Sequence, residues 1–162
     1  MKKLQVRLIN DSKTDIIIDN GIFNQLSSLL DSISDYTNFV IITDQNVYHH
    51  YEKLIKQQFK NYQYNIIICP DGEKTKSFEN LEKIYSDLIK FGCDRNSYLV
   101  AFGGGVIGDM TGFIAATFMR GIKYINIPTT LLSMVDSSIG GKTGFNLSHG
   151  KNLIGSIYHP EI

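Results

Sequence analysis

The sequence predicts an α/β domain of the Rossmann-like, doubly wound type, with a mainly parallel sheet and an N-terminal β-hairpin. Two observations carry this prediction. Short apolar runs typical of buried strands alternate with segments of helical periodicity along the chain. One of these runs, residues 98–102, leads through Gly103, Gly104 and Gly105 into the long apolar segment VIGDMTGFIAATFMRG. A strand, a glycine turn and a helix in that order suit phosphate binding.

The predicted elements follow one another without an internal repeat. Leu4, Val6 and Leu8 alternate with polar residues and precede an apolar run at 16–18, so we expect a hairpin with its turn at residues 10–13. Apolar residues at helical spacing predict helices over 22–33, 47–59 and 78–89, the last ending near Gly92. Apolar runs predict strands over 39–42, 64–69, 98–102 and 124–127.

The loops that follow these strands define the expected binding edge, because ligands of a doubly wound sheet bind beyond the carboxyl ends of its strands. They cover residues 44–46, 71–76, 103–109 and 128–130 and are rich in Gly, Asp, Thr and Lys. Residues 131–160 hold five glycines, two lysines and little clean periodicity, so we expect a long functional loop there. Lys142 and Lys151 each follow a glycine, an arrangement that often holds phosphate.

The glycine turn admits more than one interpretation. Gly103, Gly105 and Gly108 fit the pattern G-x-G-x-x-G, but a tight strand-to-helix turn without a ligand fits them too. An ordinary Rossmann fingerprint is disfavoured, because the motif does not follow the first strand and the next strand ends at Pro128 without an acidic residue to hold a ribose. Asp109 is expected in the first helical turn, where it would repel a diphosphate and would instead face a ribose or the nicotinamide end.

Composition and small motifs exclude several classes of protein. The 162 residues suit one domain, 1–162, and the 16 basic and 16 acidic residues form no basic block, so nucleic acid is not an expected partner. No membrane-spanning run or signal-peptide pattern occurs, and the widely spaced Cys69 and Cys93 suit a reducing cytoplasm. A P-loop is improbable because its first glycine would fall at Asp136. The histidines are expected on the surface or in loops and not as metal ligands: His49, His50, His149 and His159.

Taken together, three segments make the chain similar to the 3-dehydroquinate synthase family of sugar-phosphate cyclases. They are PDGEKTKSFENL at 70–81, AFGGGVIGDMTGFIAATFMRGI at 101–122, and PTTLLSMVDSSIGGKTGFN with GKNLIG between 128 and 155. The resemblance implies a dinucleotide-binding first half, a mostly helical second half that supplies a Glu and two His ligands for a divalent metal, and NAD in the cleft between them. The helical C-terminal domain is absent from this sequence, so we expect a truncated chain that is inactive alone.

The resemblance also implies roles for individual positions. Asp136, Lys142, Lys151 and Asn152 would face the substrate, and Arg120 would reach the substrate phosphate of the neighbouring subunit in a homodimer. The implied NAD-binding residues are Asp44, Asn46, Asp71, Gly72, Glu73, Lys74, Thr75, Lys76, Gly104, Gly105, Val106, Ile107, Gly108, Asp109, Thr129, Thr130, Lys142 and Lys151.

The implied reaction belongs to the shikimate pathway of aromatic amino acid biosynthesis. It converts 3-deoxy-D-arabino-heptulosonate 7-phosphate to 3-dehydroquinate and phosphate with catalytic NAD and a divalent metal, zinc or cobalt. Hydride chemistry belongs to the cofactor, whereas phosphate elimination needs a cationic cradle, for which Lys142, Lys151 and Asn152 are candidates.

Three alternatives stay open at this stage. The first is another sugar-phosphate cyclase of the 2-deoxy-scyllo-inosose synthase type. The second is a metal-dependent glycerol or alcohol dehydrogenase, which would not need the two lysines. The third is a nucleotide-binding module without catalysis.

Overall fold

The computed structural model describes residues 1–7, 13–147 and 149–162, and a parallel sheet forms its centre. Within these residues the central sheet has four strands in the order β4-β3-β5-β6, and all neighbours pair in parallel. The bounds are β3 Phe39–Asp44, β4 Tyr64–Cys69, β5 Tyr98–Gly103 and β6 Lys123–Pro128. Every residue of β5 is buried, as expected for a strand covered on both faces.

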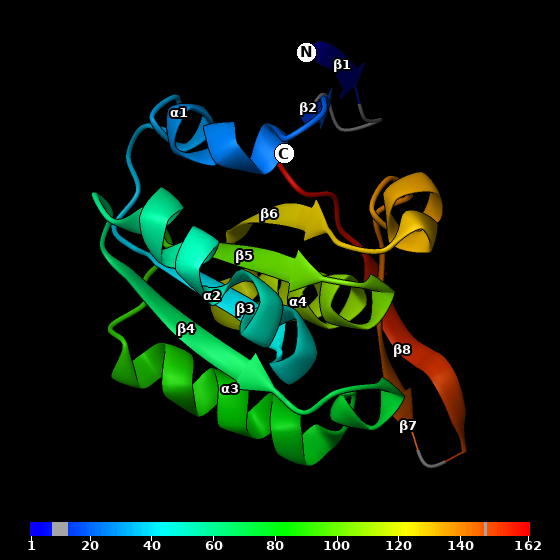
Figure 1. Cartoon of the computed structure of the whole chain (residues 1–162). Coiled ribbons are helices and arrows are strands. Elements are labelled where there is room, and N and C mark those ends of the chain that lie inside the picture. Colours follow the sequence, from blue (N-terminus) through cyan, green and yellow to red (C-terminus); the bar gives the residue numbers. More distant parts are fainter. Residues whose placement is uncertain (8–12, 148) are drawn as a thin grey trace.

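Helices cover both faces of this sheet (Figure 1). Leu30 of α1 and Phe59 of α2 belong to one apolar cluster, whereas Leu88 of α3 and Ile114 of α4 belong to a second cluster on the opposite face. The bounds are α1 Leu26–Leu30, α2 Gln45–Phe59, α3 Phe78–Lys90 and α4 Gly105–Thr117. The predicted doubly wound α/β fold is therefore confirmed. Among the described helices, none combines the length and apolarity needed to cross a membrane.

The helix expected over residues 22–33 is shorter and less regular than its spacing indicated. A 3-10 turn, η1 (Ile22–Gln25), precedes the five residues of α1, and Ile33 lies beyond the helix end. Ile33 nevertheless packs against the same cluster as Leu30, because its N–H donates to the Leu30 carbonyl at 3.0 Å and turns the chain back. The apolar spacing of residues 22–33 thus reflects packing against one face of the sheet and not a continuous helix. The other short helices are η2 Glu73–Thr75, η3 Phe118–Arg120 and the π-helix η4 Ser133–Ser137.

The N-terminal hairpin is confirmed. β1 (Lys2–Arg7) and β2 (Lys13–Ile18) pair antiparallel in continuous register, whereas Leu8 and turn residues 10–12 lie outside the described residues. The last residues of the chain return to this hairpin. The Thr14 hydroxyl donates to the Pro160 carbonyl at 2.8 Å, and the Asp15 N–H donates to the Glu161 carbonyl at 2.9 Å.

The prediction of a long loop over residues 131–160 is wrong. This segment contains η4 and a second antiparallel hairpin, formed by β7 (Lys142–Leu147) and β8 (Gly150–Ile157). Glycines within both strands and an irregular register between Phe145 and Leu147 hide the alternation that would have predicted strands. Phe145 is fully buried with its ring 4.9 Å from Phe78 and 6.1 Å from Phe113, which fixes the hairpin against α3 and α4. Figure 1 shows this hairpin beside the edge toward which the strands of the central sheet point.

Tyr98 links the start of β5 to the end of the chain, and its environment predicts a pH dependence. Its hydroxyl donates to Glu161 Oε2 at 2.6 Å, and burial together with this hydrogen bond raises the pKa of Tyr98 to about 12. An unfolded chain ionises the same group near pH 10, so the folded state binds more protons between these values. The free energy of unfolding should therefore fall by at most about 1.4 kcal/mol per pH unit from this group between pH 10 and 12.

Urea titrations of the protein and of Tyr98→Phe at several pH values test this expectation. At pH 8 the variant should be less stable by about 1 kcal/mol, because it lacks the hydrogen bond. This difference should shrink and reverse toward pH 12, whereas Tyr51→Phe, at an exposed position, should follow the parent. Parallel curves for the parent and Tyr98→Phe would contradict the assignment.

Candidate functional site

Four loops meet at the carboxyl edge of the sheet, and hydrogen bonds of two aspartates order the loops after β3 and β4. The chain reverses its winding between β3 and β5, and such a reversal opens a crevice at the strand ends. Asp44, at the end of β3, caps α2 by accepting from the Val47 N–H at 2.8 Å. Asn46 donates its N–H to Asp71 Oδ1 at 3.0 Å, which ties the loop after β3 to the loop after β4.

The glycine turn at residues 103–105 borders this crevice opposite the loops after β3 and β4. α4 begins at Gly105, and among the described residues no side chain caps its N-terminus. The first amides of the helix are therefore available to an anion. A Cβ on Gly104 would lie 3.2 Å from Thr130 Cγ2, and one on Gly105 would lie 3.2 Å from Ser137 Oγ. The turn is thus a narrow backbone cradle that an anion can approach closely.

Asp109 lies later in this helix than expected. Because α4 begins directly after the N-cap Gly104, Asp109 is its fifth residue and belongs to the second turn, not the first. The two threonines close the other side of the turn. The Thr129 N–H donates to the Gly103 carbonyl at 2.9 Å, and Thr130 holds the start of η4 through hydrogen bonds with Ser133.

A buried lysine lies at the centre of the site. The side chain of Lys76 is 1% exposed, and its Nζ lies 2.9 Å from Asp109 Oδ2 and 2.5 Å from Asn152 Oδ1. Glu73 Oε1 is 3.9 Å from the same nitrogen. Lys76 therefore joins the loop after β4, helix α4 and strand β8 through one ammonium group.

The same contact changes the electrostatics of Asp109. Burial raises the pKa of Asp109 above its ordinary value, Lys76 opposes that shift, and nearby Glu73 and Asp136 add to it. With Lys76 beside it, the Asp109 carboxylate is partly neutralised. The repulsion that a free carboxylate would exert on a diphosphate bound to this helix is reduced accordingly.

Asn146 is a polar residue of this site that sequence reasoning missed. Its Nδ2 donates to Glu73 Oε1 at 2.7 Å, and its Oδ1 accepts from the Asn152 N–H at 2.9 Å. No local signal marks it, because the register irregularity between Phe145 and Leu147 and the glycines of the hairpin hide the strand that carries it.

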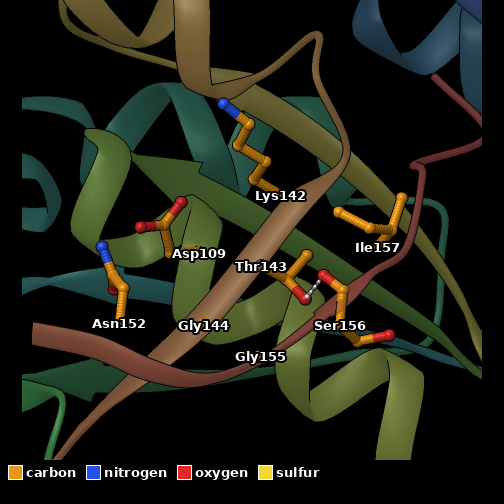
Figure 2. Close-up of a pocket in the computed structure, with 8 residues that line it drawn as sticks. All are labelled: Asp109, Lys142, Thr143, Gly144, Asn152, Gly155, Ser156 and Ile157. Carbon is orange, nitrogen blue, oxygen red and sulfur yellow. Dashed lines mark hydrogen bonds between the residues drawn. The ribbon is translucent and has the colours of Figure 1, made fainter.

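A cavity of about 330 Å³ lies between α4 and the second hairpin. Figure 2 shows the Asp109 carboxylate, the Asn152 amide and the Lys142 side chain along one side of it, with Ile157 at the other end. Lys142 is exposed, and Lys151 is 72% exposed, with a 3.9 Å contact to Glu73 Oε2 as its one ion pair among the described residues. An ion pair so exposed contributes little, so the Lys151 ammonium group, like that of Lys142, can turn toward a bound anion.

Most of the predicted site residues therefore lie along one edge, but Arg120 does not. It follows α4, whose length separates it by roughly 20 Å from Gly105. Met119 (φ 49°) and Arg120 (φ 70°) both have left-handed backbone conformations, which residues other than glycine rarely adopt. Such strain is found where surroundings or function require it.

The described residues do not form a metal centre. Within residues 1–7, 13–147 and 149–162, no group of three or more His, Cys, Asp or Glu side chains could hold a metal ion.

The chain is similar in sequence to one family of known proteins. A family model described as 3-dehydroquinate synthase N-terminal matches residues 66–162, more than half of the chain. The curated 3-dehydroquinate synthase of Clostridium botulinum (strain Alaska E43 / Type E3) is 44% identical over 164 residues, covering 100% of this chain and 47% of that relative. The chain thus spans about half the length of this relative.

Solved structures agree with this result. A 2-deoxy-scyllo-inosose synthase complexed with carbaglucose-6-phosphate, NAD+ and Co2+ superposes with a TM-score of 0.87 at 27% identity, over 98% of this chain and 44% of that one. A 2-epi-5-epi-valiolone synthase from Streptomyces hygroscopicus subsp. jinggangensis 5008, with NAD+ and Zn2+ bound, gives 0.79 at 28% identity, over 97% and 43% of the two chains.

The buried pair makes a prediction about stability. Lys76→Met removes the only cation within salt-bridge distance of Asp109 in the described part of the chain, so unfolding by urea should show a loss of about 3 kcal/mol. Lys74→Met, at an exposed position two residues earlier, should change stability by less than about 0.5 kcal/mol. Adding Asp109→Asn to Lys76→Met should recover part of the loss, since no carboxylate then remains without its partner. Equal effects of the two lysine substitutions would contradict this picture.

Proposed function

This chain belongs to the 3-dehydroquinate synthase family, and from that premise we propose that the whole protein is a 3-dehydroquinate synthase. Its substrate would be 3-deoxy-D-arabino-heptulosonate 7-phosphate, and its products 3-dehydroquinate and phosphate. The observation that carries the proposal is the similarity to a curated 3-dehydroquinate synthase along the entire chain. Residues 1–162 would form one domain of that protein, namely its NAD-binding half.

We place NAD across the carboxyl edge of the sheet. The uncapped amides at Gly105 and Val106 would hold the diphosphate, because the helix dipole and unpaired N–H groups favour an anion there. Asp44 and the loop that contains Asp71 and Lys74 border the adjoining crevice, in keeping with their predicted cofactor contacts. When bound, NAD supplies reversible hydride transfer at a hydroxyl of the substrate. The NAD+ present in two related cyclases supports NAD as the cofactor.

The substrate phosphate would lie near Lys142 and Lys151. These two exposed ammonium groups of the glycine-rich hairpin would stabilise the negative charge that develops on phosphate as it leaves. Asn152 accepts from Lys76 through Oδ1, so it presents its Nδ2 group as a donor to a substrate oxygen. Asp136 would border the same region from η4.

The remaining parts of the proposal lie outside this domain. Zinc or cobalt would be bound by residues of the helical half, in line with the metals named for the two related cyclases. The strained Arg120, far from the edge of its own subunit, would serve the site of a partner in a homodimer. The free, buried Cys69 and Cys93 support a cytoplasmic location.

A related sugar-phosphate cyclase is the second candidate, because the solved 2-deoxy-scyllo-inosose synthase has the same fold along nearly the whole chain. The higher identity to the curated 3-dehydroquinate synthase favours the first candidate. A glycerol or alcohol dehydrogenase is less suited to the site, because its substrates carry no phosphate for the two lysines.

Phosphate release by the whole protein tests the proposal. With NAD and zinc or cobalt present, the protein should release phosphate from 3-deoxy-D-arabino-heptulosonate 7-phosphate and not from glucose 6-phosphate. Lys142→Ala should lower kcat/KM by about 10- to 100-fold, because the anion loses a charge-assisted partner worth about 1.5–3 kcal/mol.

Lys53→Ala is the matched control, since Lys53 is exposed on α2 and belongs to no part of the proposed site. It should leave kcat/KM unchanged. Turnover of glucose 6-phosphate alone would replace the proposal with the second candidate. Normal kinetics for Lys142→Ala would remove this lysine from the phosphate site.

A further inference from the structure

Asn146 makes two hydrogen bonds whose chemistry fixes its orientation. The carboxylate of Glu73 can only accept, and the N–H of Asn152 can only donate, so the Asn146 amide satisfies both in a single orientation. The resulting contacts form a closed ring of four residues. Asn146 contacts Glu73 and Asn152, Asn152 accepts from Lys76, and Lys76 lies 3.9 Å from Glu73.

The backbone around Asn146 explains why its side chain reaches the ring. The register of β7 and β8 shifts between Phe145 and Leu147, as in a β-bulge, and bulges near binding sites redirect side chains. Asn152 has a left-handed backbone with φ 51°, and its N–H is bonded to the Asn146 side chain. The conformation of the start of β8, which carries Lys151 and Asn152, therefore depends on Asn146.

We propose that Asn146 is a positioning residue that locks the loop carrying Glu73 and Lys76 to the hairpin carrying Lys142 and Lys151. This inference rests on the proposed function, since it assigns the two segments to cofactor and substrate. Asn146 is half-buried, and the hairpin is fixed independently by the buried Phe145. Substitution of Asn146 should therefore disturb the relative position of the two segments without unfolding the hairpin.

Exchange of the hydrogen-bond donor and acceptor between Asn146 and Glu73 tests their contact in the whole protein. Asn146→Asp places two carboxylates against each other and should lower kcat/KM at pH 8 by about 10- to 100-fold. Lowering the pH should restore part of the activity, because one shared proton recreates a donor between the two carboxyl groups. Glu73→Gln added to Asn146→Asp also recreates a donor, so the double variant should be at least tenfold more active than the product of the single effects predicts. Additive effects and an unchanged pH profile would overturn the proposal.

Hydrogen exchange at the backbone N–H of Asn152, which donates to the Asn146 side chain, separates this inference from the proposed function. In Asn146→Ala that amide should exchange at least tenfold faster than in the parent, whereas Asn61→Ala, at an exposed position after α2, should leave it unchanged. If the parent lacks dehydroquinate synthase activity but the amide responds in this way, the proposed function fails and the ring is supported. An unchanged exchange rate overturns the ring whatever the activity.

Discussion

The ammonium of Lys76 lies inside the protein, where a charge is tolerated only if oxygen atoms of other residues surround it. Here those atoms come from Asp109 and Asn152, with Glu73 slightly farther away. They belong to segments that are separate in sequence and meet at the carboxyl edge of the sheet. The relative position of the loop after β4, helix α4 and the second hairpin therefore depends on one buried cation. Leaving either the Lys76 ammonium or the Asp109 carboxylate without its partner would cost free energy, so this contact holds the three segments together.

This arrangement shapes the chemistry that the edge can support. Lys76 partly neutralises Asp109, so the nearby N-terminus of α4 keeps its preference for an anion. The exposed Lys142 and Lys151 are left free of strong internal partners in the described part of the chain. A dinucleotide along the glycine turn and a phosphorylated substrate beside the hairpin are compatible with this division between structural and ligand-binding charges. A nucleotide-binding module without catalysis would have no evident need for the exposed Lys142 and Lys151.

Much of the fold could be predicted from the sequence because its signals are local. The apolar run before Gly103 and the helical spacing over residues 78–89 each report burial within one element. The second hairpin could not be predicted, because its glycines and the bulge near Asn146 interrupt strand alternation. The burial of Lys76 could not be predicted either. A lysine in a polar loop is ordinarily exposed, and its partner Asn152 is 76 residues away in sequence.

The burial of Lys76 is tested most directly by the NMR signal of the lysine side-chain ammonium groups at neutral pH. Exposed ammonium protons exchange with water too fast to be seen, whereas an enclosed and hydrogen-bonded group is protected. We expect a protected ammonium signal that disappears in Lys76→Met, persists in Lys74→Met, and exchanges faster in Asn152→Ala. A spectrum without such a signal, or one in which the signal survives Lys76→Met, would contradict the claim that a buried Lys76 holds the edge together.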